Sequence, residues 1–209
     1  MKLKEEEKWM EISILKKNLE RLNIKVSVFD TKEQASDYLC SKIDGETVGI
    51  GGSMTVKEMG LYERLCEKND VAWHLVDEGR APELIAKAAA AKTYITGANA
   101  IAEEGAIVNL DGFGNRVAST LFGHEKVYII SGINKLVPTL QEAIERVRNV
   151  ASPLNARRLK KKTPCAKGEL KCYNCASEDR ICSGFSIIIA KPGSIGYMEL
   201  VLVRQELGF

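Results

Sequence analysis

Several features of membrane, secreted and nucleic-acid-binding proteins are missing from this chain of 209 residues. No stretch approaches the about 18 consecutive apolar residues of a membrane-spanning helix, and the charged residues 1–8 lack the apolar run of a signal peptide. The charges nearly balance, with 30 Lys and Arg against 28 Asp and Glu, whereas a DNA- or RNA-binding protein or a polybasic membrane protein needs a large basic excess. We therefore expect a cytoplasmic protein with no nucleic-acid or membrane partner.

The order of elements predicts an α/β fold with a parallel sheet covered on both faces. Short apolar runs alternate with helical patterns of about 10–15 residues through most of residues 25–150, which is typical of βαβ units. The chain length suits a single domain over residues 1–209. The expected strands are 25–29, 47–50, 72–76, 93–96, 106–110 and 126–131. The expected helices are 4–22 at the N-terminus and those opened by capping boxes at Thr31–Gln34, Thr55–Glu58 and Thr139–Glu142, with a further helix near 81–88.

The sequence changes character near residue 153. A basic run over 157–171 leads into a cysteine-rich stretch, and we interpret residues 153–184 as an insertion or flap. Two apolar runs follow, 185–190 and 197–203, joined by a segment that contains proline and glycine. They predict a C-terminal β-hairpin that returns to the main sheet.

A glycine-rich loop follows the strand at 47–50 and precedes a helix. Glycine lets backbone approach a ligand closely, and the unpaired N–H groups at the start of a helix favour an anion. The spacing fits neither a dinucleotide-binding fingerprint nor a P-loop. The candidate ligand-binding residues are Gly51, Gly52, Ser53 and Thr55. The alternative is a tight turn in which Ser53 or Thr55 only caps the helix.

The polar segment 96–116 follows a second strand end of the predicted sheet. A carboxylate there could act as nucleophile or general base, and an arginine could bind an anion through two hydrogen bonds. The candidate catalytic residues are Glu103 and Glu104, and the candidate ligand-binding residues are Gly97, Asn99, Asn109, Asp111, Gly112, Asn115 and Arg116. The alternative is that Asp111 and Asn115 only form turns and that the glutamates are solvated.

Four of the six cysteines fall within 18 residues, as Cys165-x6-Cys172-x2-Cys175-x6-Cys182. Four thiolates can hold zinc or an iron–sulfur cluster, although the spacing matches neither a zinc ribbon nor a ferredoxin motif. A redox-active or disulfide pair, or free cysteines in a flap, are the alternatives. Cys40 and Cys66 are expected to be packing thiols on helices, and His74 and His124 to be structural.

Three sequence blocks, in order, resemble the LUD (lactate-utilization) domain family. They are GIGGSMTVKEMGL, TGANAIAEEGAIVNLDGFGNRVA and ISGINKLV, and the ending PLNARRL…TPC…KCYNC…RIC…LVRQELGF resembles the family too. The family is similar in fold to the sugar-phosphate isomerase, CoA-transferase and formyltetrahydrofolate cyclo-ligase group. The resemblance thus implies a three-layer α/β/α, Rossmann-like sheet with a pocket between the glycine loop and segment 96–116.

Three functions are open, of which the first two follow from the resemblance. The first is a component of the oxidation of lactate or a similar small organic acid, which binds an anionic small molecule and works with iron–sulfur redox subunits. The second is a CoA-transferase- or cyclo-ligase-like enzyme with Glu103 or Glu104 as nucleophile. The third is a non-catalytic ligand sensor or assembly subunit. A homodimer is also possible.

Overall fold

The computed structural model describes residues 12–209 of the chain. Residues 12–20 are helical, in agreement with the end of the helix expected over 4–22, whose residues 4–11 lie outside the described part. Within residues 12–209 no helix is long and apolar enough to cross a membrane.

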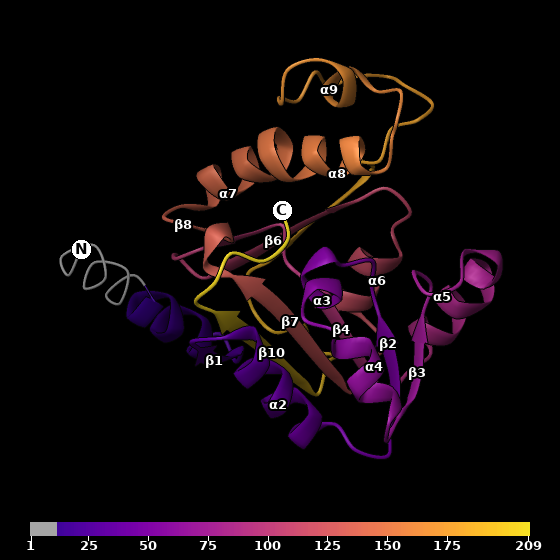
Figure 1. Cartoon of the computed structure of the whole chain (residues 1–209). Coiled ribbons are helices and arrows are strands. Elements are labelled where there is room, and N and C mark those ends of the chain that lie inside the picture. The colour runs from indigo at the N-terminus through magenta and orange to yellow at the C-terminus, as the bar shows by residue number, and fades with distance from the viewer. Residues whose placement is uncertain (1–11) are drawn as a thin grey trace.

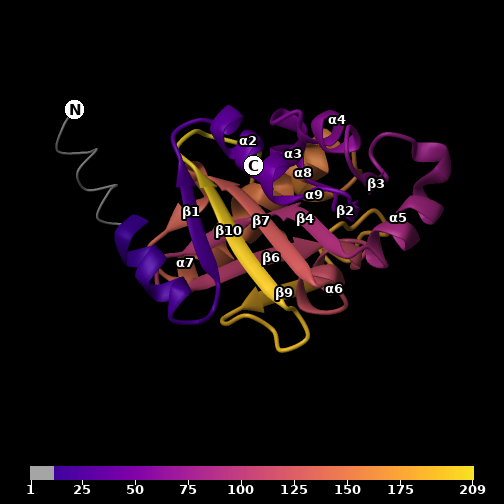
Figure 2. The same ribbon diagram turned by 90° about the horizontal axis from the view of Figure 1, so that it is seen from below.

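The centre of the molecule is a six-stranded sheet in which all neighbouring strands are parallel (Figures 1 and 2). In spatial order the strands are β1 (Lys25–Phe29), β10 (Tyr197–Val203), β7 (Lys126–Gly132), β4 (Thr93–Gly97), β2 (Thr47–Ile50) and β3 (Asp70–Trp73). Side chains on both faces of β10, β7 and β4 are buried, as expected of a parallel sheet covered on both sides. The predicted α/β class is confirmed.

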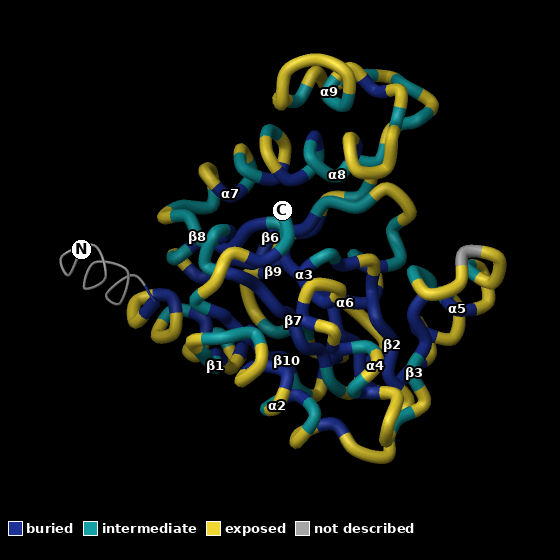
Figure 3. Tube along the Cα trace, in the orientation of Figure 1, coloured by how far each residue is buried: buried dark blue, intermediate teal, exposed yellow. Residues whose placement is uncertain are grey.

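Helices cover both faces of this sheet. On one face lie α2 (Lys32–Lys42), α3 (Met54–Glu58) and α4 (Leu61–Cys66), which contribute Leu39 and Leu65 to a shared core with Ile50 and Val201. On the other face lie helix 12–20 and α5 (Ala81–Ala89). Figure 3 shows the central strands of the sheet, such as β7 and β10, as largely buried.

Two of the three predicted capping boxes are present. Thr31 and Gln34 open α2, and Thr139 and Glu142 open α7 (Leu140–Arg146), each with both reciprocal hydrogen bonds. The third prediction is wrong by two residues, because Ser53 is the cap of α3 and accepts a hydrogen bond from the N–H of Val56. Thr55 lies inside the helix, where its hydroxyl has other partners.

A second sheet corrects the expectation that residues 106–110 join the parallel sheet. Its order is β8 (Leu136–Val137), β5 (Ala100–Ala102), β6 (Ala106–Asp111) and β9 (Gly184–Ile188), with β6 antiparallel to both neighbours. A parallel return needs a crossover of about a dozen residues, and the chain between β4 and β6 is too short for one. It turns instead at Gly105, whose φ is +102°.

The predicted C-terminal hairpin is wrong for a related reason. β9 pairs with β6 in the second sheet, while β10 enters the central sheet between β1 and β7. Loop length and turn residues alone suggested a hairpin. However, β10 buries both faces, which is the pattern of a central parallel strand and not of a hairpin arm with one wet face.

The helices that follow β8 in the chain pack on the outer face of the second sheet. α7, the π-helical turn Val147–Ala151 and α8 (Ser152–Arg158) follow one another directly (Figure 1), and Ala143 and Val147 pack on β5 and β6. The first residues of the predicted insertion thus belong to α8. Short elements complete the fold: α6 (Asn115–Leu121), α9 (Pro164–Lys167) and the 3-10 helices Glu78–Arg80 and Ile133–Lys135.

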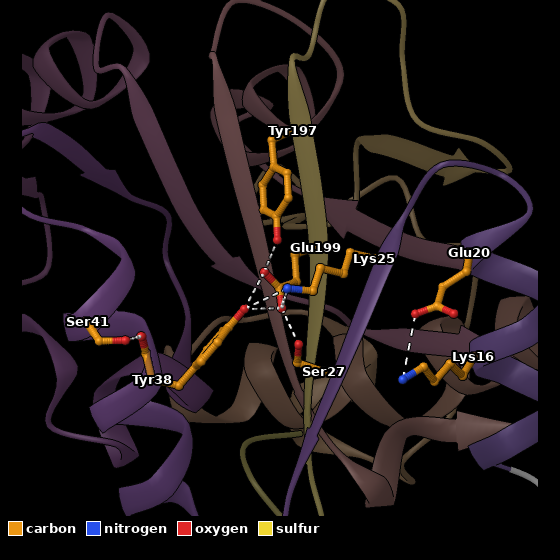
Figure 4. A network of polar contacts seen from close by, with 8 residues as sticks. All are labelled: Lys16, Glu20, Lys25, Ser27, Tyr38, Ser41, Tyr197 and Glu199. Atoms are coloured by element: carbon orange, nitrogen blue, oxygen red, sulfur yellow. Dashed lines mark hydrogen bonds and ion pairs between the residues drawn. The ribbon is translucent and has the colours of Figure 1, made fainter.

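The carboxylate of Glu199 on β10 is fully buried between the central sheet and α2 (Figure 4). It accepts hydrogen bonds from Ser27 on β1, from Tyr38 on α2 at 2.9 Å and from Tyr197. Lys25 Nζ lies 3.9 Å away. A buried charge is tolerated only when it is paired and hydrogen-bonded, so this network ties β1, β10 and α2 together.

The two cysteines outside the cluster differ in burial. Cys40 on α2 is half-buried against the core, whereas Cys66 at the end of α4 is exposed. The expectation of a packing thiol is therefore wrong for Cys66, since the helix ends there and the side chain faces solvent.

Candidate functional site

A small cavity lies at the carboxyl ends of β2 and β4, where the glycine loop meets segment 96–116. Its volume is about 50 Å³. Its lining residues are Gly52, Ser53, Met54, Thr55, Leu75, Gly97, Ala98, Asn99, Arg116, Lys135, Asn155, Arg158 and Phe209. The edge that holds the carboxyl ends of the strands is the usual ligand site of open α/β sheets. Two regions that the sequence singled out separately thus line one space.

Close packing at this edge requires glycine at two positions. A β carbon on Gly97 would lie 2.7 Å from Ser53 Oγ, and one on Gly51 would lie 2.7 Å from the hydroxyl of Tyr94. A side chain at either position would force these polar groups to move. Trp73 Nε1 donates to the Gly51 carbonyl at 3.0 Å and holds the loop in place.

Arg116 forms the wall of the cavity on the α6 side and is 8% exposed. Its guanidinium donates to Asn109 Oδ1 at 2.7 Å, to Asn99 Oδ1 at 2.9 Å and to the carbonyls of Gly97 and Leu110. All four acceptors are uncharged, so none of them neutralises the arginine. Burial lowers the pKa of Arg116, and its positive charge adds to the potential in the cavity.

Lys135 lies opposite, at the end of the 3-10 helix that follows β7, and is 3% exposed. Its Nζ donates to Thr55 Oγ1 at 2.8 Å and to the Ala98 carbonyl at 3.1 Å. Burial, followed by the charges of Arg146 and Arg116, lowers the pKa of Lys135 to about 7. A lysine that gains or loses its charge near neutrality is common at functional sites and uncommon elsewhere.

Two more cations approach the same space. Arg158 on α8 lines it and donates to Asn155 Oδ1 at 2.8 Å, and burial lowers the pKa of Arg158. Arg146 on α7 donates to the Asn99 carbonyl at 2.6 Å. Among the lining residues in the described part of the chain, three side chains are cationic and none is acidic.

The C-terminal residues close one side of the cavity. Leu207 N–H donates to Asn134 Oδ1 at 3.1 Å, and Gly208 N–H donates to Glu58 Oε2 at 2.8 Å. Thr55 Oγ1 donates in turn to the Leu207 carbonyl at 3.3 Å. These contacts place Phe209 in the lining.

Of the predicted ligand-binding residues, Gly52, Ser53, Thr55, Gly97, Asn99 and Arg116 line the cavity. The other five lie behind it or beside it. Gly51 and Asn109 support the lining, Asp111 Oδ2 accepts from the N–H of Arg116 at 2.9 Å, and Asn115 is the first residue of α6. Gly112 packs on the backbone of Ile181.

The two predicted catalytic glutamates lie in the turn between β5 and β6 and are not part of the lining. Glu104 Oε2 accepts a hydrogen bond from the N–H of Leu140 at 2.9 Å, at the start of α7. The Glu103 N–H donates to the Val137 carbonyl. No observation therefore favours a glutamate nucleophile at this cavity.

Sequence reasoning missed Lys135, Arg158, Asn155 and the C-terminal residues as lining groups. One signal for Lys135 was available. It lies between Ile133 and Leu136, two apolar residues, within the block ISGINKLV. No comparable signal marks Arg158, which is one of several basic residues in the run 157–171.

The four clustered cysteines face a different cavity, of about 410 Å³, between the end of α7, α8 and the second sheet. All four are half-buried free thiols. Within residues 12–209, no three His, Cys, Asp or Glu side chains are arranged to hold a single metal ion.

The model of the LUD domain family matches residues 12–203. The chain belongs to the LUD domain family. The resemblance noted in the motif blocks is thereby confirmed. The LUD domain described here also shares its fold with the crystal structure of a DUF162 family protein from Deinococcus radiodurans, with a TM-score of 0.54 over 93% of this chain and 96% of that chain. At 12% identity this likeness concerns the fold alone. No curated protein matches the chain.

Proposed function

We propose that this LUD domain binds a small organic-acid anion in the 50 Å³ cavity, as a component of the oxidation of lactate or a similar acid. The observation that carries the proposal is the position of Lys135. Its buried Nζ faces a lining that contains Arg116 and Arg158 and, among the described residues, no acidic side chain. Burial removes hydrating water from a cation, and a bound anion compensates for that loss. Such a site therefore stabilises a negatively charged ligand.

The size of the cavity favours a small ligand. One water needs about 10–15 Å³ on this scale, so about 50 Å³ accommodates a molecule of a few heavy atoms. A lactate-sized carboxylate fits this limit, whereas a CoA or folate would have to lie largely outside the cavity. The size therefore favours a small organic acid as the ligand held inside.

The lining provides separate groups for the two ends of a 2-hydroxy acid. Lys135 and Arg158 supply cationic donors for the carboxylate, and the side chains of Ser53 and Asn99 supply polar atoms for the hydroxyl or keto group. Oxidation of a hydroxy acid to a keto acid removes two electrons and two protons. We assign the binding step to this chain, and propose that the two electrons pass one at a time to iron–sulfur redox subunits and the two protons to solvent.

The test is isothermal titration of the full chain with lactate, pyruvate and the neutral analogue lactamide. We expect binding of an acid and not of the amide. Lys135→Met and Arg158→Met should each weaken binding by about 10-fold or more, because a hydrogen bond to a charged group contributes about 1.5–3 kcal/mol. Lys57→Met is the matched control, since Lys57 is an exposed lysine on α3 that does not line the cavity.

Equal binding of lactate and lactamide would contradict an anion site. An equal loss of affinity in Lys57→Met would show that only the overall charge matters, and would also contradict the proposal.

A further inference from the structure

We propose that Cys165, Cys172, Cys175 and Cys182 bind a polynuclear iron–sulfur cluster in the 410 Å³ cavity beside α8. The proposal is independent of the anion site. Its basis is that four thiols from a segment with little regular structure line one cavity, although 16 residues lie between the first and the last in the sequence.

The local backbone brings the central pair together. Asn174 lies between Cys172 and Cys175 and adopts a left-handed conformation with φ of +44°. The Asn174 N–H donates to Cys172 Sγ at 3.4 Å. An N–H donor directed at a cysteine sulfur is the contact that commonly surrounds cluster ligands and tunes them.

The outer pair is held by contacts to α8 and to the same loop. Cys165 lies on α9, and Arg157 on α8 donates to the Ala166 carbonyl at 3.2 Å, which fixes α9 over α8. Cys182 is placed by Arg180, whose guanidinium donates to the carbonyls of Cys182 at 2.9 Å and Cys175 at 2.8 Å. One arginine thus bridges two of the four proposed ligands.

The charge and polarity of the cavity fit a thiolate-bound cluster. Arg148 and Arg180 line it, and Arg148 Nη2 donates to Cys172 Sγ at 3.6 Å. Two guanidinium groups offset part of the negative charge of four thiolates. The remaining wall is largely apolar, with Leu110, Ile144, Pro153, Phe185 and Ile187.

The spread of the thiols argues for a cluster over a single zinc ion. Zinc draws four sulfurs to about 2.3 Å. Here the four cysteines line one cavity, but the described residues contain no group of three that could hold one ion. A cluster of several iron and sulfide ions can bind thiolates that lie farther apart than the ligands of one ion.

The loop itself is unusual without a bound group. No helix or strand is present between α9, which ends at Lys167, and β9, which begins at Gly184. A segment of this length without secondary structure is uncommon in a compact domain unless it is functional or disordered. Four metal–sulfur bonds would supply the ordering energy that this polar segment lacks.

The experiment uses the full chain, purified and reconstituted under anaerobic conditions with ferrous iron and sulfide, and in parallel with zinc alone. We expect about four iron and four sulfide ions per chain, a broad brown absorption, and protection of the four thiols from alkylation. Cys172→Ser and Cys175→Ser should lose most of the iron. Cys66→Ser, which removes an exposed cysteine on α4, should retain it.

Circular dichroism of each variant separates a lost ligand from a lost fold. The proposal is overturned if the folded chain takes up one zinc per molecule and no iron, or if Cys66→Ser loses as much iron as Cys172→Ser. Unprotected thiols after reconstitution would also overturn it. None of these outcomes depends on whether the anion site binds lactate.

Discussion

Lys135 Nζ donates a hydrogen bond of 2.8 Å to Thr55 Oγ1, across 80 residues of sequence. This contact joins the end of the 3-10 helix after β7 to helix α3. It places a buried cation directly behind the glycine loop, next to Ala98, and so gives the cavity its positive charge.

The affinity for a carboxylate should fall as pH rises above about 7. The pKa of Lys135 is lowered to about 7, chiefly by burial, so the ammonium form predominates below that pH. A bound anion stabilises the ammonium form of Lys135 and raises its pKa. Between the pKa of Lys135 in the free protein and its pKa in the complex, the affinity should therefore drop by about tenfold per pH unit. Titrations from about pH 6 to about pH 9 measure this slope.

In Lys135→Met the slope should be absent or much smaller. An unchanged slope in this variant would show that another group is responsible.

Lys135 should lower the free energy of unfolding at low pH. The pKa of Lys135 in the folded chain, about 7, lies below the ordinary value of 10.5. Between these two pH values the unfolded chain therefore binds more protons than the folded chain. Its contribution to the free energy of unfolding therefore rises with pH from about 7 to about 10.5, and the full penalty is present below about 7. We expect Lys135→Met to gain stability relative to the native chain below about pH 7, with the gain shrinking as pH rises.

Urea denaturation of the native protein and of Lys135→Met at several pH values gives the difference between their free energies of unfolding. The contributions of the other titrating groups cancel in this difference. A difference that does not change with pH would contradict the depressed pKa.

Removal of Arg116 should destabilise the fold. Arg116→Met leaves the side-chain oxygens of Asn99 and Asn109 and the carbonyls of Gly97 and Leu110 without this donor. Leaving a buried acceptor without its donor typically costs about 1–3 kcal/mol. Chemical denaturation measures the loss.

Arg64→Met is the control, because Arg64 pairs with the exposed Asp37. An exposed ion pair contributes at most about 1 kcal/mol. Comparable losses in the two variants would mean that Arg116 is not a structural centre of the site.

Gly49 on β2 should not tolerate alanine. A β carbon there would lie 2.3 Å from the carbonyl oxygen of Ala88 and 2.8 Å from its Cα, so α5 would have to move off the sheet. We expect a loss of about 1–3 kcal/mol or more, measured as a lower midpoint of thermal unfolding. Gly193→Ala has open space around the new methyl group and should change little. A tolerant Gly49→Ala would mean that α5 packs on β2 less closely than the structure indicates.

Local sequence patterns predicted a large part of the fold. The bounds of β1, β2 and β10 agree with the expected strands, and the caps of α2 and α7 were identified from residues three positions apart. The glycine loop and segment 96–116 were also expected to meet, because both follow strands of one parallel sheet.

The errors arise where partners are distant. An apolar run reports that a strand is buried, but not which strand lies beside it, so β6 and β9 were placed in the wrong sheet.

The sequence by itself determined the α/β class, the starts of α2 and α7 and the family, because these depend on periodicity, capping and motifs within short segments. Only the tertiary structure decided the composition of the site. Lys135 and Arg158 are ordinary basic residues in the sequence. They become site residues because folding buries Lys135 beside the carboxyl ends of β2 and β4 and brings the exposed Arg158 to the same cavity. The chemistry of a charged side chain depends on its desolvation and its neighbours, and both are set by long-range packing.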